Sequence, residues 1–177
     1  MDSALIDRLL SVIENSRPVP FATYSPSSLD EHDMSYEISA SDQLSKVPLV
    51  SVYMTVYNHA PFLPEAIEGV CRQKCNFAFE LIIGEDCSPD NSRTICEDYQ
   101  RRYPHIIRLI VSDQNVGGLA NCLRIFKRGR GKYMAICEGD DFWTDETKLQ
   151  KQVEAFENDP SISICYTDFT TLHMNTG

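Results

Sequence analysis

Apolar and polar positions alternate between two periodicities from Pro48 onward. Short apolar runs rich in β-branched residues, typical of buried strands, are followed by segments with apolar residues at helical spacing. The predicted strands are 49–56, 79–83, 106–111, 132–137 and 162–166, and the predicted helices are 62–73, 91–103, 119–127 and 145–158. Thr144 is the expected N-cap of the last helix. This alternation predicts an α/β fold of Rossmann-like type, a mostly parallel sheet flanked by helices.

The first 47 residues follow a different pattern. Apolar residues recur at helical spacing between positions 4 and 13, which predicts a short amphipathic helix. Prolines at positions 18, 20 and 26 then interrupt regular structure, and acidic residues follow at 30, 31 and 33. We therefore divide the chain into an N-terminal helix and linker extension, residues 1–47, and a main domain, residues 48–177.

Length and charge limit the classes of function. A chain of 177 residues suits one domain with its own core. The net charge of −10 argues against nucleic acid as a partner, because phosphate binding depends on Lys and Arg. A polyanionic nucleotide would need a cation to mediate its binding to so acidic a protein.

The cysteines indicate a reducing compartment. There are seven of them, an odd number, spread through predicted strands and helices, which is typical of reduced and buried thiols. Cys71 and Cys75 have the spacing of half a metal site, but the four scattered histidines supply no other half. No apolar run approaches the roughly 18 residues of a membrane span, and the start lacks the features of a signal peptide. We expect a cytoplasmic protein.

Candidate chemistry gathers where the predicted strands end. Asp140 and Asp141 follow the strand 132–137, and Glu85 and Asp86 follow the strand 79–83. The first strand ends in polar residues as well, at Thr55, Tyr57 and Asn58. Because the carboxyl ends of parallel strands share one edge, where ligands of open α/β sheets bind, these groups should line one crevice.

Carboxylates collected at one edge repel each other unless a cation lies between them. Mg²⁺ and Mn²⁺ prefer oxygen ligands, and they commonly take one or two carboxylates together with substrate phosphates. The acidic pair Asp140–Asp141 therefore predicts a seat for a metal–diphosphate complex. Taken alone, the pair would equally suit an acidic turn exposed to solvent.

Known phosphate-binding fingerprints are absent. There is neither a Gly-x-x-x-x-Gly-Lys-Ser/Thr loop nor a Gly-x-Gly-x-x-Gly after the first strand. The segment from Asn115 to Gly118 precedes a predicted helix, and its backbone N–H groups could assist a phosphate. A plain loop explains it equally well.

Four ordered motifs resemble family 2 inverting glycosyltransferases, in the nucleotide-sugar-binding N-terminal half of their GT-A fold. The opening Val-Ser-Val-x-x-x-x-Tyr-Asn of that family is matched at 50–58, and its Asp-Asp-x-Ser-x-Asp motif is matched at 85–90. The Asn-x-Gly loop is matched at 115–117 and the x-Asp-Asp metal motif at 139–141. The resemblance covers residues 48–168.

The resemblance implies a role for each matched residue. Thr55 and Tyr57 would line the base pocket, and Asp86 would accept a hydrogen bond from the base. Asp140 would contact the ribose or the metal, and Asp141 would bind Mg²⁺ or Mn²⁺. Other matched residues expected to bind substrate are Asn58, Glu85, Asn115 and Gly117. The implied reaction is inverting transfer of a sugar from a nucleotide-diphospho-sugar to an acceptor hydroxyl.

The chain departs from the family pattern at two positions. Glu85 replaces the first Asp of the second motif, which leaves its role open. After Gly117 the family often has Ala-Arg-Asn, and this chain does not. Arg124 is a candidate substitute for the missing diphosphate contact, and a solvated helix position is the simpler interpretation.

A general base for the acceptor hydroxyl is not recognisable. The family supplies that carboxylate after the metal motif. Of the acidic residues that follow here, Asp145, Glu146, Asp159 and Asp168, none aligns with the base position. We expect that the chain stops before the acceptor subdomain, and that its catalytic residue is absent.

Three alternatives compete with a transferase. A catalytically incomplete nucleotide-binding fragment would also lack the base. A signalling receiver domain shares the acidic strand ends but needs a strand-end Lys, which is not found after Asp113. A sugar nucleotidyltransferase needs a Gly-rich basic loop after its first strand, where this chain has Asn-His-Ala-Pro.

The family resemblance also implies partners and a location. The expected partners are the nucleotide-sugar donor and a saccharide or lipid-linked acceptor of cell-envelope polysaccharide biosynthesis. Work at the inner face of the membrane, with peripheral membrane association, is the expected setting.

Overall fold

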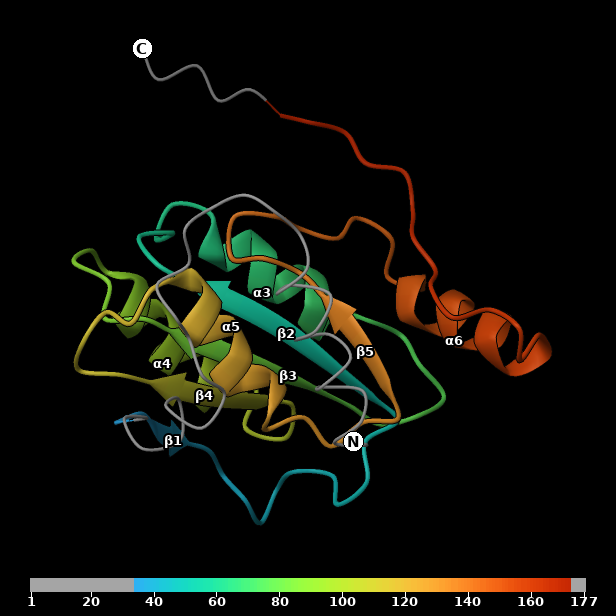
Figure 1. The fold of residues 1–177 in the computed structure, drawn as a ribbon, viewed down its shortest axis with the longest axis horizontal. Helices are drawn as coiled ribbons and strands as arrows, with labels where there is room; N and C mark the ends of the chain where they lie inside the picture. Colours follow the sequence, from blue (N-terminus) through green and yellow to red (C-terminus); the bar gives the residue numbers. More distant parts are fainter. Residues whose placement is uncertain (1–33, 173–177) are drawn as a thin grey trace, which may run out of the picture.

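The computed structural model describes residues 34–172, so the expected helix near residues 4–13 lies outside the described part. Five strands form one sheet in the order β1-β4-β3-β2-β5 (Figure 1). Strand β1 is antiparallel to β4, and the other neighbouring pairs are parallel. The strands are β1 (Tyr36–Ile38), β2 (Val50–Val56), β3 (Phe79–Glu85), β4 (Ile107–Val111) and β5 (Tyr133–Ile136). The helices are α3 (Leu63–Cys71), α4 (Ser92–Arg102), α5 (Gly118–Phe126) and α6 (Lys148–Asn158).

Helices cover both faces of the sheet. On one face, alternate residues of β2, β3 and β4 such as Val52 and Leu81 pack against apolar side chains of α3, α4 and α6. On the other face, the intervening residues Tyr53, Ile82 and Ile110 pack against Ile125 of α5. This period of two is that of a strand buried on both sides. The α/β fold expected from the sequence, a mostly parallel sheet flanked by helices, is confirmed.

Two elements differ from the sequence-based expectation. Strand β1 lies within the segment expected to be a linker, where Glu37 pairs with Ile110 of β4. The strand expected at 162–166 is wrong: this segment has no regular structure and is mostly exposed. A strand needs a hydrogen-bonding neighbour, and none of residues 34–172 pairs with it.

Helix α6 begins three residues later than expected. Its N-cap is Thr147 rather than Thr144, and its first residue is Lys148. The preceding segment is bound instead to the residues that follow α3: the side chain of Gln73 donates to Asp145 O at 2.7 Å, and Lys74 N donates to Glu146 O at 2.7 Å. These tertiary bonds hold the backbone of residues 145 and 146 in a non-helical conformation.

Among residues 34–172 we find no candidate for a membrane-spanning helix.

Candidate functional site

The sheet order brings the expected site residues to one edge. Strand β2 lies between β3 and β5, and all three run in the same direction. Beyond the strands, Asp86 N donates to Val56 O at 3.0 Å and Gly139 N donates to Thr55 O at 3.2 Å. The end of β2, with Thr55, Tyr57 and Asn58, therefore lies between Asp86 on one side and the acidic segment 138–141 on the other.

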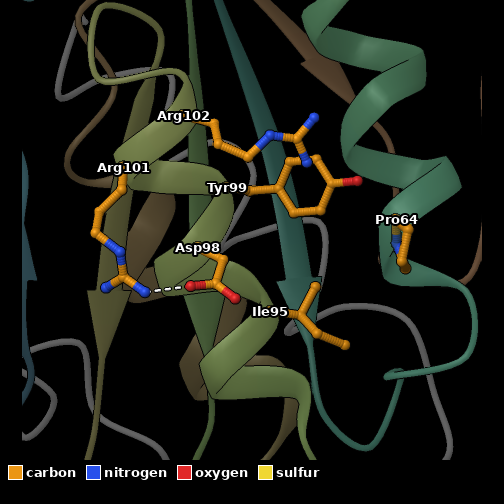
Figure 2. A pocket seen from close by; sticks show the side chains of 6 residues that line it. All are labelled: Pro64, Ile95, Asp98, Tyr99, Arg101 and Arg102. Atoms are coloured by element: carbon orange, nitrogen blue, oxygen red, sulfur yellow. Dashed lines mark hydrogen bonds and ion pairs between the residues drawn. The ribbon is translucent and has the colours of Figure 1, made fainter.

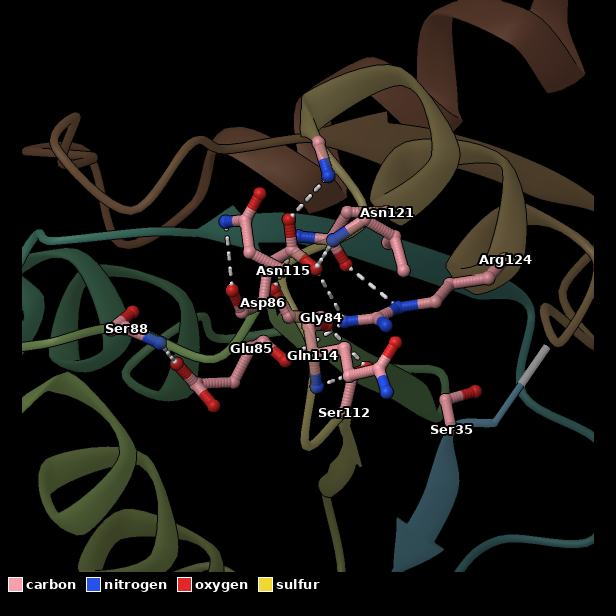
Figure 3. A network of polar contacts seen from close by, with 12 residues as sticks. Ser35, Gly84, Glu85, Asp86, Ser88, Ser112, Gln114, Asn115, Asn121 and Arg124 are labelled. Atoms are coloured by element: carbon pink, nitrogen blue, oxygen red, sulfur yellow. Dashed lines mark hydrogen bonds and ion pairs between the residues drawn. The ribbon is translucent and has the colours of Figure 1, made fainter. Parts of the chain in front are cut away.

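Asp86 binds the loop that contains Asn115 and Gly117. Its two carboxylate oxygens accept hydrogen bonds from Val116 N at 3.0 Å and Gly117 N at 2.9 Å (Figure 3). The amide of Asn115 donates to Asp86 O at 3.0 Å. Gly117 has a φ of 87°, which favours glycine. The second and third motifs are therefore joined through a carboxylate that is only 1% exposed.

Glu85 and Arg124 are buried beside Asp86. The Glu85 carboxylate accepts from Ser88 N at 2.6 Å and from Arg93 at 2.8 Å. Arg124 donates to Glu85 O at 2.8 Å and lies 3.6 Å from the Asp86 carboxylate. Figure 3 shows the part of this network around Glu85, Ser88 and Arg124. The interpretation of Arg124 as a solvated helix residue is wrong, because its side chain is buried. Its guanidinium donates to Glu85 O, next to Asp86.

A second set of contacts holds the loop that follows β2. Three consecutive backbone N–H groups donate to side chains of the segment that leads into α4: Asn58 to Ser88 at 3.1 Å, His59 to Ser92 at 3.0 Å, and Ala60 to Asp90 at 3.0 Å. Burial opposes ionisation of Asp90, but hydrogen bonds from Ser92 outweigh it and hold the pKa of this carboxyl below its ordinary value. Asn58 has a φ of 60°, a left-handed conformation that such anchoring sustains.

Glu138 is a site residue that the sequence reasoning did not single out. Its carboxylate accepts a hydrogen bond from the hydroxyl of Thr55, so the first turn after β5 reaches across to the end of β2. The only sequence signal was its membership in the acidic run before Asp140. His59, whose imidazole faces Asp140, was also missed.

Asp140 and Asp141 lie at the open rim of the edge. Both are exposed, and Asp141 N donates to Glu138 O at 3.1 Å, which closes the turn. Within residues 34–172 no group of three or more His, Cys, Asp or Glu side chains is arranged to hold a metal alone. The donor set is thus one or two hard carboxylate oxygens open to solvent. It fits a Mg²⁺ or Mn²⁺ ion that keeps its other positions for phosphate and water.

The described cysteines are free thiols. Burial raises the pKa of Cys71 to about 12 and that of Cys75 to about 11, so both are protonated at neutral pH. Neither belongs to a metal-binding group among the described residues. Structural thiols remain the better interpretation of this pair.

A hollow of about 420 Å³ lies elsewhere, between α3 and α4. Figure 2 shows its lining, in which Asp98 and Arg101 form an ion pair and the Arg102 guanidinium stacks over the Tyr99 ring. The lining comes from helices and includes none of the strand-end residues. This hollow is therefore separate from the candidate site.

Three of the acidic residues that follow the metal motif, Asp145, Asp159 and Asp168, lie on or beyond the segment leading into α6. A hydrogen bond from Lys151 holds the pKa of Asp145 well below its ordinary value. Asp159 accepts from Ser161, and Asp168 lies in the exposed irregular segment after α6.

Known proteins resemble this chain in sequence. A profile of the glycosyl transferase family 2 matches residues 51–172. An uncharacterized protein of Mycobacterium tuberculosis is 38% identical over 117 residues, 66% of this chain and 34% of that protein. The putative teichuronic acid biosynthesis glycosyltransferase TuaG of Bacillus subtilis is 30% identical over 125 residues, 71% of this chain and 48% of TuaG. The chain thus spans a third to a half of these relatives.

Solved structures share the fold. The mannosyltransferase PcManGT from Pyrobaculum calidifontis, in complex with GDP-Man and Mn²⁺, has a TM-score of 0.58 at 19% identity, over 67% of this chain and 34% of that one. S. aureus TarS 1-349 in complex with UDP has a TM-score of 0.54 at 22% identity, over 62% of this chain and 32% of that one. At these identities the likeness concerns the fold, which is that of GT-A glycosyltransferases. Since the family profile spans most of the sheet and every strand-end motif, the chain belongs to glycosyl transferase family 2.

Proposed function

We propose that this chain is the donor-binding part of a glycosyltransferase, which moves a sugar from a nucleotide-diphospho-sugar to an acceptor hydroxyl with inversion. The observation that carries the proposal is the convergence of three strand ends on one acidic edge. Thr55 lies in β2, whereas Asp86 and Asp140 follow β3 and β5, and the loops after β2 and β4 are fixed by side-chain-to-backbone bonds. A site held in this way is pre-organised for a ligand.

The proposed donor lies across the end of β2. Tyr57, which is 48% exposed, offers a ring for the base, and Thr55 and Asp86 bound the pocket beside it. Both oxygens of Asp86 already accept backbone N–H groups, but each has a second lone pair for a base N–H. Asn115 and Gly117 belong to the loop that Asp86 holds, and Asn58 and Glu85 are joined to each other through Ser88 on the adjacent loops.

Asp140 and Asp141 are the proposed seat of Mg²⁺ or Mn²⁺. When bound there, the cation would neutralise negative charge on the diphosphate leaving group. Its role for the protein is also electrostatic, since a chain of net charge −10 repels a nucleotide without it. PcManGT in complex with GDP-Man and Mn²⁺ supports both the cation and the donor class.

The acceptor class is inferred from relatives. TuaG, named for teichuronic acid biosynthesis, and the minor teichoic acid biosynthesis protein GgaB of Bacillus subtilis, which is 32% identical over 99 residues, support saccharide or lipid-linked acceptors of the cell envelope. Such acceptors would place the protein in the cytoplasm at the inner face of the membrane, in peripheral association.

The metal assignment is tested by calorimetric titration of UDP in the presence of Mn²⁺. Asp141→Ala should weaken binding at least about tenfold, because it removes one hard ligand. Asp113→Ala is the matched control, since Asp113 is an exposed carboxylate paired with Arg93 at the end of β4. Equal affinities of the parent and Asp141→Ala would contradict the proposal.

A further inference from the structure

His59 occupies an unusual position at the donor edge. It follows β2 in the anchored loop, and its side chain is 24% exposed. One ring nitrogen, Nε2, lies 4.0 Å from a carboxylate oxygen of Asp140. The other, Nδ1, is buried and has no hydrogen-bond partner among residues 34–172. The Nε2 side of the ring therefore faces the metal motif.

Gly139 makes room for this ring. A Cβ atom added to Gly139 would lie 2.7 Å from His59 Nδ1 and 3.0 Å from Thr55 O, closer than side chains pack. The imidazole thus lies directly against the backbone of the metal motif. The backbone of His59 is held in place, because His59 N donates to the side chain of Ser92, the fully buried first residue of α4.

The two environments of the ring select a tautomer. A neutral imidazole donates from one nitrogen and accepts at the other. A proton on Nε2 faces the Asp140 carboxylate, whereas a proton on Nδ1 would be buried without an acceptor among the residues that the structure describes. The Nε2–H tautomer therefore suits this site, in which Nε2 and the exposed Asp140 carboxylate are 4.0 Å apart.

We propose that His59 is a positioning residue for Asp140: it donates from Nε2 to the carboxylate and orients it toward the cation of a metal–nucleotide complex. Within the described residues, His59 is the one ion-pair partner of Asp140, whose side chain is 52% exposed. Without such a partner this carboxylate would have to be ordered when the cation binds. The inference rests on the proposed function, since it assigns His59 to the same metal site.

Two amide substitutions separate the ring nitrogens. The side-chain N–H of Gln reaches the position of Nε2, and that of Asn reaches the position of Nδ1. With UDP and Mn²⁺, we expect His59→Gln to keep its affinity within about threefold and His59→Asn and His59→Leu to lose about tenfold or more, the range for partners of metal-binding carboxylates. With UDP and EDTA, all four proteins should bind alike. Equal affinities of Gln and Asn variants, or an equal loss in EDTA, would overturn the inference.

A second readout does not need the nucleotide or the metal. Nitrogen-15 NMR of the imidazole in the unliganded parent should show the Nε2–H tautomer, and the Nδ1–H tautomer would refute the contact with Asp140. The two proposals also fail differently. A parent that binds no UDP with Mn²⁺ contradicts the proposed function, whereas a parent that binds as tightly as His59→Leu contradicts the role of His59 alone.

Discussion

At the scale of single residues, two glycines near the site differ in what surrounds them. Gly84 lies in β3 under α5, and its carbonyl accepts from the buried side chain of Asn121 at 2.7 Å. A Cβ atom there would collide with the Asn121 side chain and lie 2.7 Å from Ile125 Cγ2. Gly118, the first residue of α5, has nothing within 4 Å of such an atom.

We predict that Gly84→Ala destabilises the protein by about 1–3 kcal/mol, the cost of overpacking a closed interior. Gly118→Ala should be neutral or gain about 0.4–1 kcal/mol by restricting the unfolded chain. Urea unfolding followed by circular dichroism measures both. Equal stabilities of the two variants would show that β3 and α5 are not packed this closely.

At the scale of elements, a buried cluster of charges ties four strands together. Glu80 of β3, which is 1% exposed, accepts from Ser51 of β2 at 2.6 Å, from Arg108 of β4 at 3.3 Å and from Arg130 at 2.6 Å. Arg108 also binds Glu37 of β1 at 2.7 Å. Burial opposes ionisation of Glu80, but the bonds from Arg130 and Ser51 outweigh it and lower the pKa of the carboxyl.

Glu80→Gln should lower the free energy of unfolding by about 1–3 kcal/mol at pH 7, because Arg108 and Arg130 lose a buried carboxylate acceptor while Arg108 keeps its pair with Glu37. Asp98→Asn, which breaks an exposed pair with Arg101, should change it by only about 0–1 kcal/mol.

The stabilisation from Glu80 also depends on pH. Since its folded pKa lies below the ordinary value of 4.5, its contribution is full above that pH and is lost as the pH falls further. Denaturant unfolding between neutral pH and pH 3 should therefore show the parent approaching Glu80→Gln in stability. A gap that stays constant into acid would contradict the ion pair.

Periodicity predicted most elements because the burial of each one repeats along its own sequence. In helix α3 and strand β2, the buried positions can be identified from the spacing of apolar residues within the element itself. Strand β1 could not be predicted, because three residues carry no period and its place depends on the edge of β4 and on the bond from Arg108 to Glu37. The 162–166 segment has the apolar pattern of a strand, but it has no neighbouring strand among the described residues. Without such a neighbour its backbone N–H and C=O groups cannot form the hydrogen bonds of a sheet.

The candidate site was predictable where chemistry follows a strand end, as at Asp86 and Asp140. It was not predictable where a residue acts on a distant partner. Glu138 meets Thr55, 83 positions earlier in the chain, and Asp90 holds Ala60, 30 positions earlier. The same holds for His59, whose partner is set by the register of β2 and β5.

At the scale of the whole molecule, the described residues include the candidate site at the ends of β2, β3 and β5 and an exposed segment after α6. Beyond α6, the large apolar side chains of Ile164, Tyr166 and Phe169 are 82%, 87% and 90% exposed, and this segment runs away from the sheet (Figure 1). Asp168 lies among them. A base needs a fixed place beside the acceptor hydroxyl, whereas Asp168 is exposed in a segment without regular structure.

We therefore predict that the 177-residue chain binds a nucleotide-sugar and forms no glycoside. Positioned general-base catalysis contributes about 10²–10⁴-fold, so its loss should leave slow hydrolysis at most. Incubation with labelled UDP-sugars and a panel of saccharide acceptors measures this, with binding checked by calorimetry. Robust glycoside formation would mean that the base lies within this chain, and Asp168→Asn and Asp145→Asn would then identify it.

The order of the strands has a consequence for how the molecule folds. The candidate site at the strand ends is completed by the parallel pairing of β2 with β5, which places Val50 opposite Tyr133, 83 positions later in the chain. Such non-local pairing forms slowly, because the intervening loop must close before any contact rewards it. A folding intermediate with β2, β3 and β4 in place would still lack Gly139, Asp140 and Asp141 beside Thr55. Nucleotide and metal would therefore recognise only the last state on the pathway, and their binding would slow unfolding rather than speed folding.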